Sequence, residues 1–169
     1  MGQPEFWMRG ITVEGIAPAL QPVAHALLQG LEDLEGVAAS LSVDELWARP
    51  GGAASAGFHL RHLAGSLDRL TTYARGDALT DAQIAALRTE QEPGDGADAL
   101  LAHVRATTER ALDQLRATPE DSLDEPRFVG RARLPSSVRG LLYHAGEHTS
   151  RHTGQVVTTA KIVRGLAGG

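Results

Sequence analysis

Apolar residues recur at intervals of three and four along most of this chain, which is the spacing of amphipathic helices. Four long segments show this rhythm: 16–41, 56–75, 97–117 and 136–164. The segment 127–135 lacks helical spacing, and we expect it to form an extended loop. The pattern therefore predicts an all-α protein.

Residues that cap helices mark several ends of these segments. Ser42 and Glu45 fit a capping box that opens a short helical turn through about residue 47. Ser55 is placed to cap the segment 56–75, and Gly76 is placed to end it. Thr80 begins a shorter helix through about residue 87, and the run Pro93–Gly96 breaks the chain before the next long helix.

Three histidines stand four residues apart in the last predicted helix: His144, His148 and His152. A step of four residues advances only about 40° around a helix, so these rings form one slowly drifting column. His152 falls on the shoulder of the apolar stripe and His148 lies beside it, whereas His144 and Glu147 lie further round. We therefore expect His148 and His152 to bind a metal together, or else to be core-edge histidines bonded to neighbours or water.

The same residues fit a second pattern. His144, Glu147 and His148 match the H-x-x-E-H arrangement, in which two histidines bind zinc and the glutamate acts as general base. The helical wheel places Glu147 nearly opposite the apolar stripe, and this motif leaves His152 unexplained. A zinc hydrolase of this type is therefore the lesser alternative.

The composition limits the metal ligands and the binding partners that the chain can have. The chain of 169 residues contains no cysteine, so nitrogen and oxygen atoms must supply any metal ligands. Its formal charge of −5 and aromatic content of 4% give little support for binding nucleic acid. Because it has neither a leader-like segment nor an apolar run of membrane-spanning length, we expect one soluble, cytoplasmic domain over residues 1–169 that does not bind membranes.

A site held by imidazoles usually has three protein ligands and one open position. His59 and His62, both near the start of the second long segment, are the candidates for the third ligand. The helical wheel favours His59, which lies nearer the leucine stripe. The choice stays open at this point, because a helix with two neighbours in a bundle can bury a wide face.

The loop that precedes the last helix carries three arginines: Arg127, Arg131 and Arg133. They meet an anionic substrate group at the mouth of a pocket, or they balance nearby acids in a solvated loop. The sequence favours the solvated loop.

Two segments, 58–73 and 144–155, together resemble the DinB/YfiT-like superfamily of metal-dependent enzymes. The resemblance extends over about residues 15–165 and depends on two histidine motifs in the right order and separation. It implies metal ligands at His62, His148 and His152, the last pair preceding a Gly-Gln dipeptide. His59 and His144 are the fallback ligands.

The resemblance also implies a fold and a chemistry. The fold is an up-down-down-up four-helix bundle with short additional helices, often a homodimer, with nickel or zinc, and otherwise iron, in a cleft. Some relatives transfer the sulfur of low-molecular-weight thiols such as bacillithiol or mycothiol. The sequence departs from the family at Thr153, where an arginine is frequent, and at Gly65 and Ser66, where an acidic residue is often found.

These observations support two functional hypotheses. The first is a metal-dependent enzyme acting on a small molecule, as a thiol S-transferase or a related hydrolase, with Asp68 or Glu147 as a candidate proton relay. The second is a non-catalytic bundle used in stress-related association, with or without a stabilising ion. In the second hypothesis four glycines let helices approach closely: Gly57, Gly65, Gly146 and Gly154.

Overall fold

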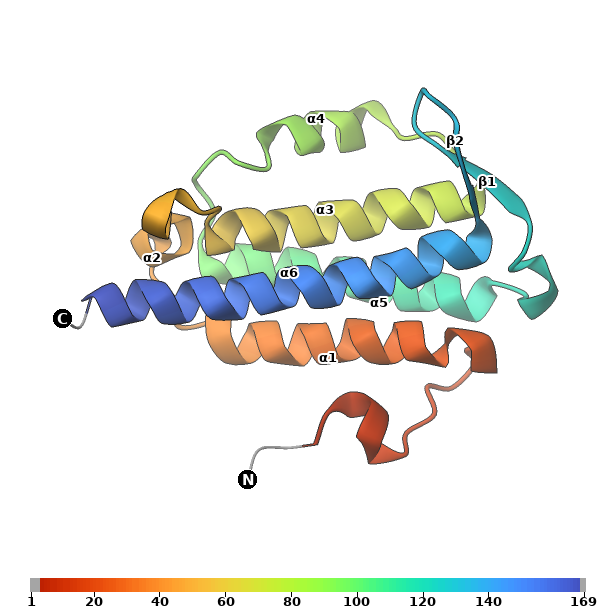
Figure 1. Cartoon of the computed structure of the whole chain (residues 1–169), viewed down its shortest axis with the longest axis horizontal. Helices are drawn as coiled ribbons and strands as arrows, with labels where there is room; N and C mark the ends of the chain where they lie inside the picture. Colours follow the sequence, from red (N-terminus) through yellow and green to blue (C-terminus); the bar gives the residue numbers. More distant parts are fainter. Residues whose placement is uncertain (1–3, 168–169) are drawn as a thin grey trace.

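The four amphipathic segments form four long helices that pack side by side in a bundle (Figure 1). The computed structural model describes residues 4–167. The long helices are α1 (Gln21–Ala38), α3 (Ala56–Arg75), α5 (Ala97–Ala117) and α6 (Val138–Ala167). Shorter elements are α2 (Val43–Trp47), α4 (Asp81–Thr89), β1 (Pro126–Val129), β2 (Leu134–Ser137) and 3-10 turns at Phe6–Arg9, Pro18–Leu20, Pro50–Gly52 and Glu120–Ser122.

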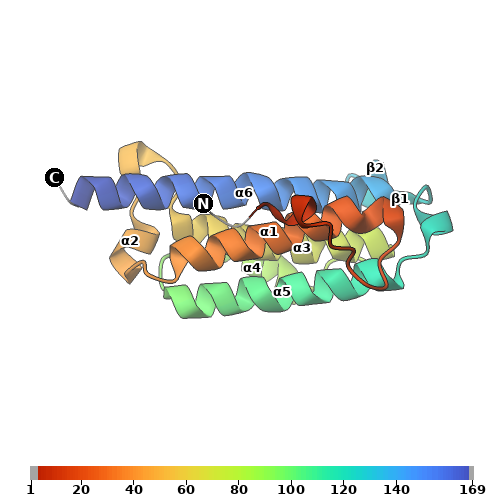
Figure 2. The same cartoon turned by 90° about the horizontal axis from the view of Figure 1, so that it is seen from below.

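The helices follow the up-down-down-up order that the resemblance implies. Helices α1 and α6 run in one direction, and α3 and α5 run in the other (Figures 1 and 2). Each long helix contacts two others, since α6 and α5 each pack against both α1 and α3. Because α3 and α5 are parallel, the chain must return along the bundle between them, and α4 lies on that return path outside α3 (Figure 1).

Helix ends follow the capping residues in the sequence. Ser42 and Glu45 form a capping box, the Ser55 hydroxyl accepts a hydrogen bond from the Phe58 N–H, and Gly76 ends α3 with a φ of 87°. A left-handed φ of this kind carries no side-chain penalty at glycine. The first helix begins at Gln21 rather than Ile16, because Pro18 opens a separate 3-10 turn ahead of it.

The segment 127–135 forms most of a β-hairpin, which corrects the expectation of an extended loop. Strands β1 and β2 are antiparallel, with Arg127 opposite Ser136 and Phe128 opposite Pro135. The strands are too short for a period of two to stand out in the sequence, and β2 includes Pro135, which is rare in strands. Helix α6 therefore begins at Val138, two residues later than expected.

The core divides into two clusters along the bundle. The first includes Leu27, Leu67 and Leu115, and the second includes Leu34, Leu63 and Val104. On α6 the first cluster ends at residue 145 and the second begins at residue 156, so residues 148 and 152 lie between them. The polar column of α6 thus interrupts the apolar core. Among residues 4–167, no helix has the length and apolar character needed to cross a membrane.

Candidate metal centre

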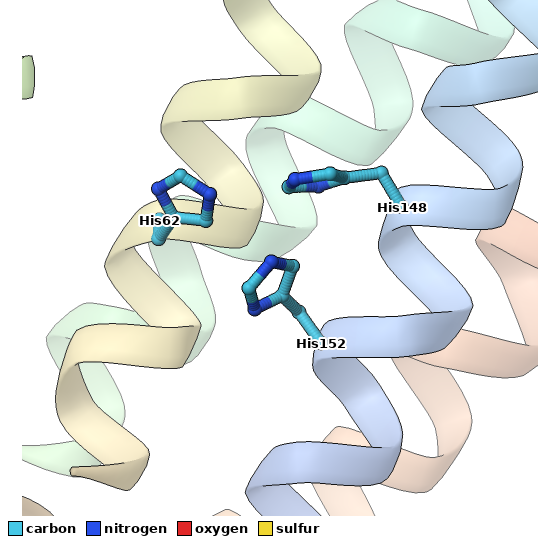
Figure 3. Close-up of side chains that lie close together, drawn as sticks. All are labelled: His62, His148 and His152. Carbon is cyan, nitrogen blue, oxygen red and sulfur yellow. The ribbon is translucent and has the colours of Figure 1, made fainter. Parts of the chain in front are cut away.

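Three histidines from two helices meet in the gap between the apolar clusters. His62 comes from α3, and His148 and His152 come from successive turns of α6 (Figure 3). One ring nitrogen of each lies within 4.8 Å of the corresponding nitrogens of the other two. The ring centroids of His62 and His148 lie 4.6 and 4.4 Å from that of His152. We refer to these three residues as the histidine cluster.

The His62 ring is held by a buried carboxylate. Its Nδ1 lies 2.7 Å from Oε2 of Glu90, whose exposed fraction is only 5%. The other carboxylate oxygen of Glu90 accepts a hydrogen bond of 2.7 Å from Nη1 of Arg69. Since Nδ1 is engaged by Glu90, Nε2 is the His62 nitrogen that remains for an ion. A carboxylate in this position fixes the tautomer and the orientation of a ligating imidazole.

Glu90 is a site residue that the sequence did not indicate. It follows the last turn of α4 and lies 28 positions from His62 in the chain, so no local spacing connects the two. Gly65 provides the room for it, because a Cβ atom at Gly65 would lie 2.7 Å from Oε1 of Glu90 and 2.8 Å from Nη1 of Arg69. Glu90 thus brings a carboxylate next to Gly65 from another segment of the chain.

The loop that carries Glu90 is fastened to α3 by Arg61. The Arg61 guanidinium donates to the carbonyl oxygen of Thr89 at 3.1 Å and to the carboxylate of Asp95 at 2.8 Å. It also lies 4.7 Å from the centroid of the Trp47 ring, within the range of a cation–π contact. These contacts hold the backbone beside Glu90 at a defined distance from His62.

His59 lies next to the histidine cluster without belonging to it. It is 6% exposed, so the helical wheel placed it in the interior correctly. Its Nδ1 lies 3.0 Å from Nδ1 of His152. This leaves Nε2 of His152 for an ion and gives His59 the same orienting role toward His152 that Glu90 has toward His62. His62 rather than His59 completes the group of three nitrogens.

His144 and Glu147 lie on the exposed face of α6. Nδ1 of His144 is 3.2 Å from Oε2 of Glu147, and Oε1 of Glu147 accepts hydrogen bonds from Arg151. The bond from Arg151 lowers the pKa of Glu147 below its usual value. The H-x-x-E-H residues lie near one another, but His144 is outside the group of three nitrogens and Glu147 is occupied by a surface ion pair.

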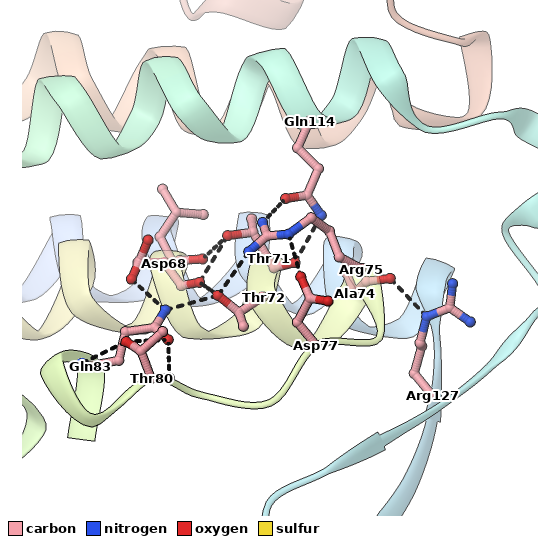
Figure 4. A network of polar contacts seen from close by, with 11 residues as sticks. Asp68, Thr71, Thr72, Ala74, Arg75, Asp77, Thr80, Gln83, Gln114 and Arg127 are labelled. Carbon is pink, nitrogen blue, oxygen red and sulfur yellow. Dashed lines mark hydrogen bonds and ion pairs between the residues drawn. The ribbon is translucent and has the colours of Figure 1, made fainter.

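Asp68 takes part in a different network. It accepts a hydrogen bond of 2.6 Å from Nε2 of Gln83, which also donates to the Thr72 hydroxyl at 2.8 Å (Figure 4). These bonds tie α4 to α3. None of the hydrogen bonds and ion pairs in the described part of the chain joins Asp68 to the histidine cluster, so its geometry indicates a structural role.

The environment keeps two cluster histidines neutral. Burial, with smaller contributions from His62 and His144, lowers the pKa of His148 to about 4. Burial and the neighbouring His148 lower the pKa of His152 to about 3. At neutral pH both rings therefore carry a free lone pair, and a metal ion does not have to displace a proton to bind them.

The donor set fits a divalent transition-metal ion. Imidazole nitrogen suits zinc, nickel, copper and iron, and three such donors match the usual ligand number of a catalytic zinc site. Because the three nitrogens already lie within 4.8 Å of one another, a single ion would be within reach of all of them. Three neutral ligands also leave the charge of an ion uncompensated.

A cavity opens beside the cluster. It has a volume of about 480 Å³ and is lined by Phe58, His62, Leu87, Arg88, Glu90 and Gln91. The Phe58 ring stacks on His62 with centroids 5.3 Å apart and planes 18° from parallel. A small molecule in this cavity can therefore approach the cluster from the His62 side.

Comparison with known proteins identifies the fold and the family of this chain. A solved structure described as a conserved protein from Enterococcus faecalis superposes with a TM-score of 0.72 at 18% sequence identity, over 86% of this chain and 96% of that chain. At this identity the likeness shows the fold alone. No curated protein matches the sequence. The family model described as the DinB superfamily matches residues 26–156, which include His62, His148 and His152. The chain belongs to the DinB superfamily.

Proposed function

We propose that this protein is an enzyme that uses a divalent metal ion, nickel or zinc, to act on a small molecule. The observation that supports this most directly is the meeting of three imidazole nitrogens from two helices within 4.8 Å of one another. His62, His148 and His152 would hold the ion. Superfamily membership supports the same assignment. So do the contacts of Nδ1 of His62 with Glu90 and of Nδ1 of His152 with His59, because they leave the other nitrogen of each ring for the ion.

The chain contributes orientation and access to this site. When bound, a divalent ion with three protein ligands acts as a Lewis acid at its open position and lowers the pKa of a thiol or water there. Glu90 and His59 fix the rings of His62 and His152, so the donor atoms are arranged before binding. The cavity beside His62 admits the substrate, and Phe58 covers one face of the ring.

The substrate we favour is a low-molecular-weight thiol, used in an S-transferase reaction. The chain has no cysteine, so a sulfur nucleophile must come from a second molecule. A hydrolase is less well supported, because Asp68 and Glu147 are both engaged away from the cluster. Glu90 is already shared between His62 and Arg69, which makes it a poor general base.

Metal analysis followed by a turnover assay tests this function. Protein purified without a histidine tag is expected to contain about one equivalent of metal per chain. It should then conjugate a low-molecular-weight thiol to an electrophile, and lose this activity on chelation. Protein that is free of metal, binds none on titration and keeps its full stability would instead support the non-catalytic bundle.

Single alanine variants test the ligand assignment. His62→Ala is expected to abolish stoichiometric metal binding, because it removes one of three donors. His144→Ala is the matched control, as it changes an exposed histidine one turn from His148 and should bind metal normally. If only His59→Ala abolishes binding, then His59 is the ligand.

We also expect the protein to form a homodimer. Light scattering coupled to size-exclusion chromatography would measure its molar mass in solution.

A further inference from the structure

A second cavity lies outside the histidine cluster, between the β-hairpin and α4. We call it the hairpin cavity. Its volume is about 770 Å³, within the range of small-molecule sites. Its walls are the end of α3, the inner side of α4 and the hairpin, with apolar surface from Tyr73, Leu79, Ile84 and Phe128.

Arginines dominate the charged lining of this cavity. Arg88, Arg127, Arg131 and Arg133 line it, together with one carboxylate, Asp77. Asp77 is already paired with Arg75 at 2.9 Å, so it does not neutralise the lining arginines. The chain as a whole carries a formal charge of −5, which makes a local excess of guanidinium groups unusual on this protein.

The four arginines are not equivalent. Arg127 is structural, since its Nε donates to the Ala74 carbonyl at 2.8 Å and its Nη2 pairs with Glu125 at 3.0 Å. Arg133 stacks its guanidinium 4.3 Å from the Phe128 centroid. Within residues 4–167, no ion pair engages Arg88, Arg131 or Arg133. These three guanidinium groups are therefore available to a bound anion.

Both walls of the cavity are fixed to the bundle. The hydrogen bonds of Gln83 to Asp68 and Thr72 hold α4, and that of Arg127 to the Ala74 carbonyl holds the hairpin (Figure 4). Arg88 lines this cavity and the smaller one beside His62, so the two cavities adjoin at that residue. The site is thus preformed, so binding a ligand does not carry the free-energy cost of ordering a loop.

We propose that the hairpin cavity is a binding site for a small organic anion with an aromatic or aliphatic body. The anionic group, a carboxylate, sulfonate or phosphate, is held by Arg88 and Arg131, and the apolar body packs against Phe128 and Ile84. Guanidinium groups suit such anions because their planar donors match pairs of oxygens. The site needs no metal ion, so it stands independently of the proposed function.

Fluorescence titration of metal-free protein tests the site. The probe is 8-anilinonaphthalene-1-sulfonate, and its uncharged counterpart N-phenyl-1-naphthylamine reports the apolar contribution alone. The wild-type chain is expected to bind one sulfonate probe saturably, in the presence of EDTA. The double variant Arg88→Gln/Arg131→Gln should raise its Kd about tenfold or more and leave the Kd of the uncharged probe within about twofold.

Matched variants distinguish binding in this cavity from nonspecific electrostatic binding and from nonspecific hydrophobic binding of the probes. Arg105→Gln/Arg139→Gln also removes two exposed arginines, which pair with Glu35 and Asp124 elsewhere, and should leave both Kd values unchanged. Phe128→Ala should weaken both probes. Equal weakening by the two double variants, no effect of Arg88→Gln/Arg131→Gln, or loss of binding on adding EDTA would each overturn the proposal.

Discussion

The contacts of the ring nitrogens determine which nitrogen of each residue in the histidine cluster is free to bind an ion. His62 and His152 each have Nδ1 engaged, by Glu90 and by His59. His148 has no such bond in the described residues and is placed by its position on α6, one turn before His152. The helical wheel favours His59 because it lies nearer the leucine stripe, and His59 is indeed more buried than His62. Burial alone therefore does not predict which of the two histidines joins the group of three nitrogens.

The stability of the metal-free protein should fall in mild acid. An unfolded histidine has a pKa near 6.5, whereas His148 and His152 have folded values of about 4 and about 3. Below pH 6.5 the unfolded state therefore binds more protons than the folded state. The stability that the two neutral rings contribute above pH 6.5 is lost as the pH falls toward 4 and 3. For each of the two rings, the free energy of unfolding should fall by about 2 kcal/mol between pH 7 and pH 5. Urea unfolding at the two pH values measures this change.

The double variant His148→Asn/His152→Asn provides the control for this pH dependence. Its free energy of unfolding should change less between pH 7 and pH 5 than that of the wild-type chain, because two titrating rings are gone. An identical slope in both proteins would mean that other groups cause the acid sensitivity.

Glu90→Gln should weaken metal binding without abolishing it. The variant keeps an oxygen near His62 but removes the negative charge that favours the ligating form of the ring. Loss of such an outer contact typically costs about 10- to 100-fold in metal affinity. Competition with a chromophoric chelator measures this directly. Glu92→Gln, an exposed acid in the same loop, should bind metal as the wild type does.

Thr153→Val should stabilise the protein modestly. The Thr153 hydroxyl is buried and has no hydrogen-bond partner in the described residues. It packs on α1, where a Cβ at Gly30 would lie 3.0 Å from it. Replacing an unsatisfied hydroxyl by a methyl group should raise the free energy of unfolding by about 1 kcal/mol, as measured by chemical denaturation. A loss of stability would indicate an unseen partner, such as a water molecule.

At the scale of helices, glycine has different uses at different positions. Gly57 faces the Trp47 ring, Gly65 faces Glu90 and Arg69, and Gly146 lies against α1. Gly154 has no neighbour within 4 Å of where its Cβ would be, so no other helix in the described part of this chain packs against it. Helix contact explains only some of these glycines, and Gly65 instead makes room for Glu90 beside His62.

Alanine at two helical glycines should therefore have opposite effects. Gly154→Ala fills open space on α6 and should raise the free energy of unfolding by about 0.5–1 kcal/mol, since alanine favours helix. Gly65→Ala puts a methyl group into the Glu90 carboxylate and should lower it by about 1–3 kcal/mol. Thermal unfolding monitored by circular dichroism compares the two, and a stabilised Gly65→Ala would contradict the packing described here.

At the scale of the whole molecule, an ion in the histidine cluster would join α3 to α6 across the gap between the two core clusters. A ligand at 100 times its Kd stabilises a folded protein by about 2.7 kcal/mol. For a domain of this size that corresponds to a rise in Tm of about 5–11 °C. Calorimetry with and without zinc or nickel measures it. His144→Ala should retain the shift and His62→Ala should lose it, whereas equal shifts in both would place the ion elsewhere.

The amino-acid sequence was enough to predict the helices, their capped ends and the histidines of α6, because apolar spacing, capping side chains and a fourfold repeat are local properties of the chain. The bundle order followed from the resemblance, which the superfamily match now supports. The resemblance pointed to His62, and the packing of α3 against α6 brings this residue into the cluster. The position of Glu90 beside His62 and the hairpin cavity, which is built from three segments, became known only from the three-dimensional arrangement. The physical reason is that these contacts join residues far apart in the chain, and their geometry is set by how the helices and the hairpin pack.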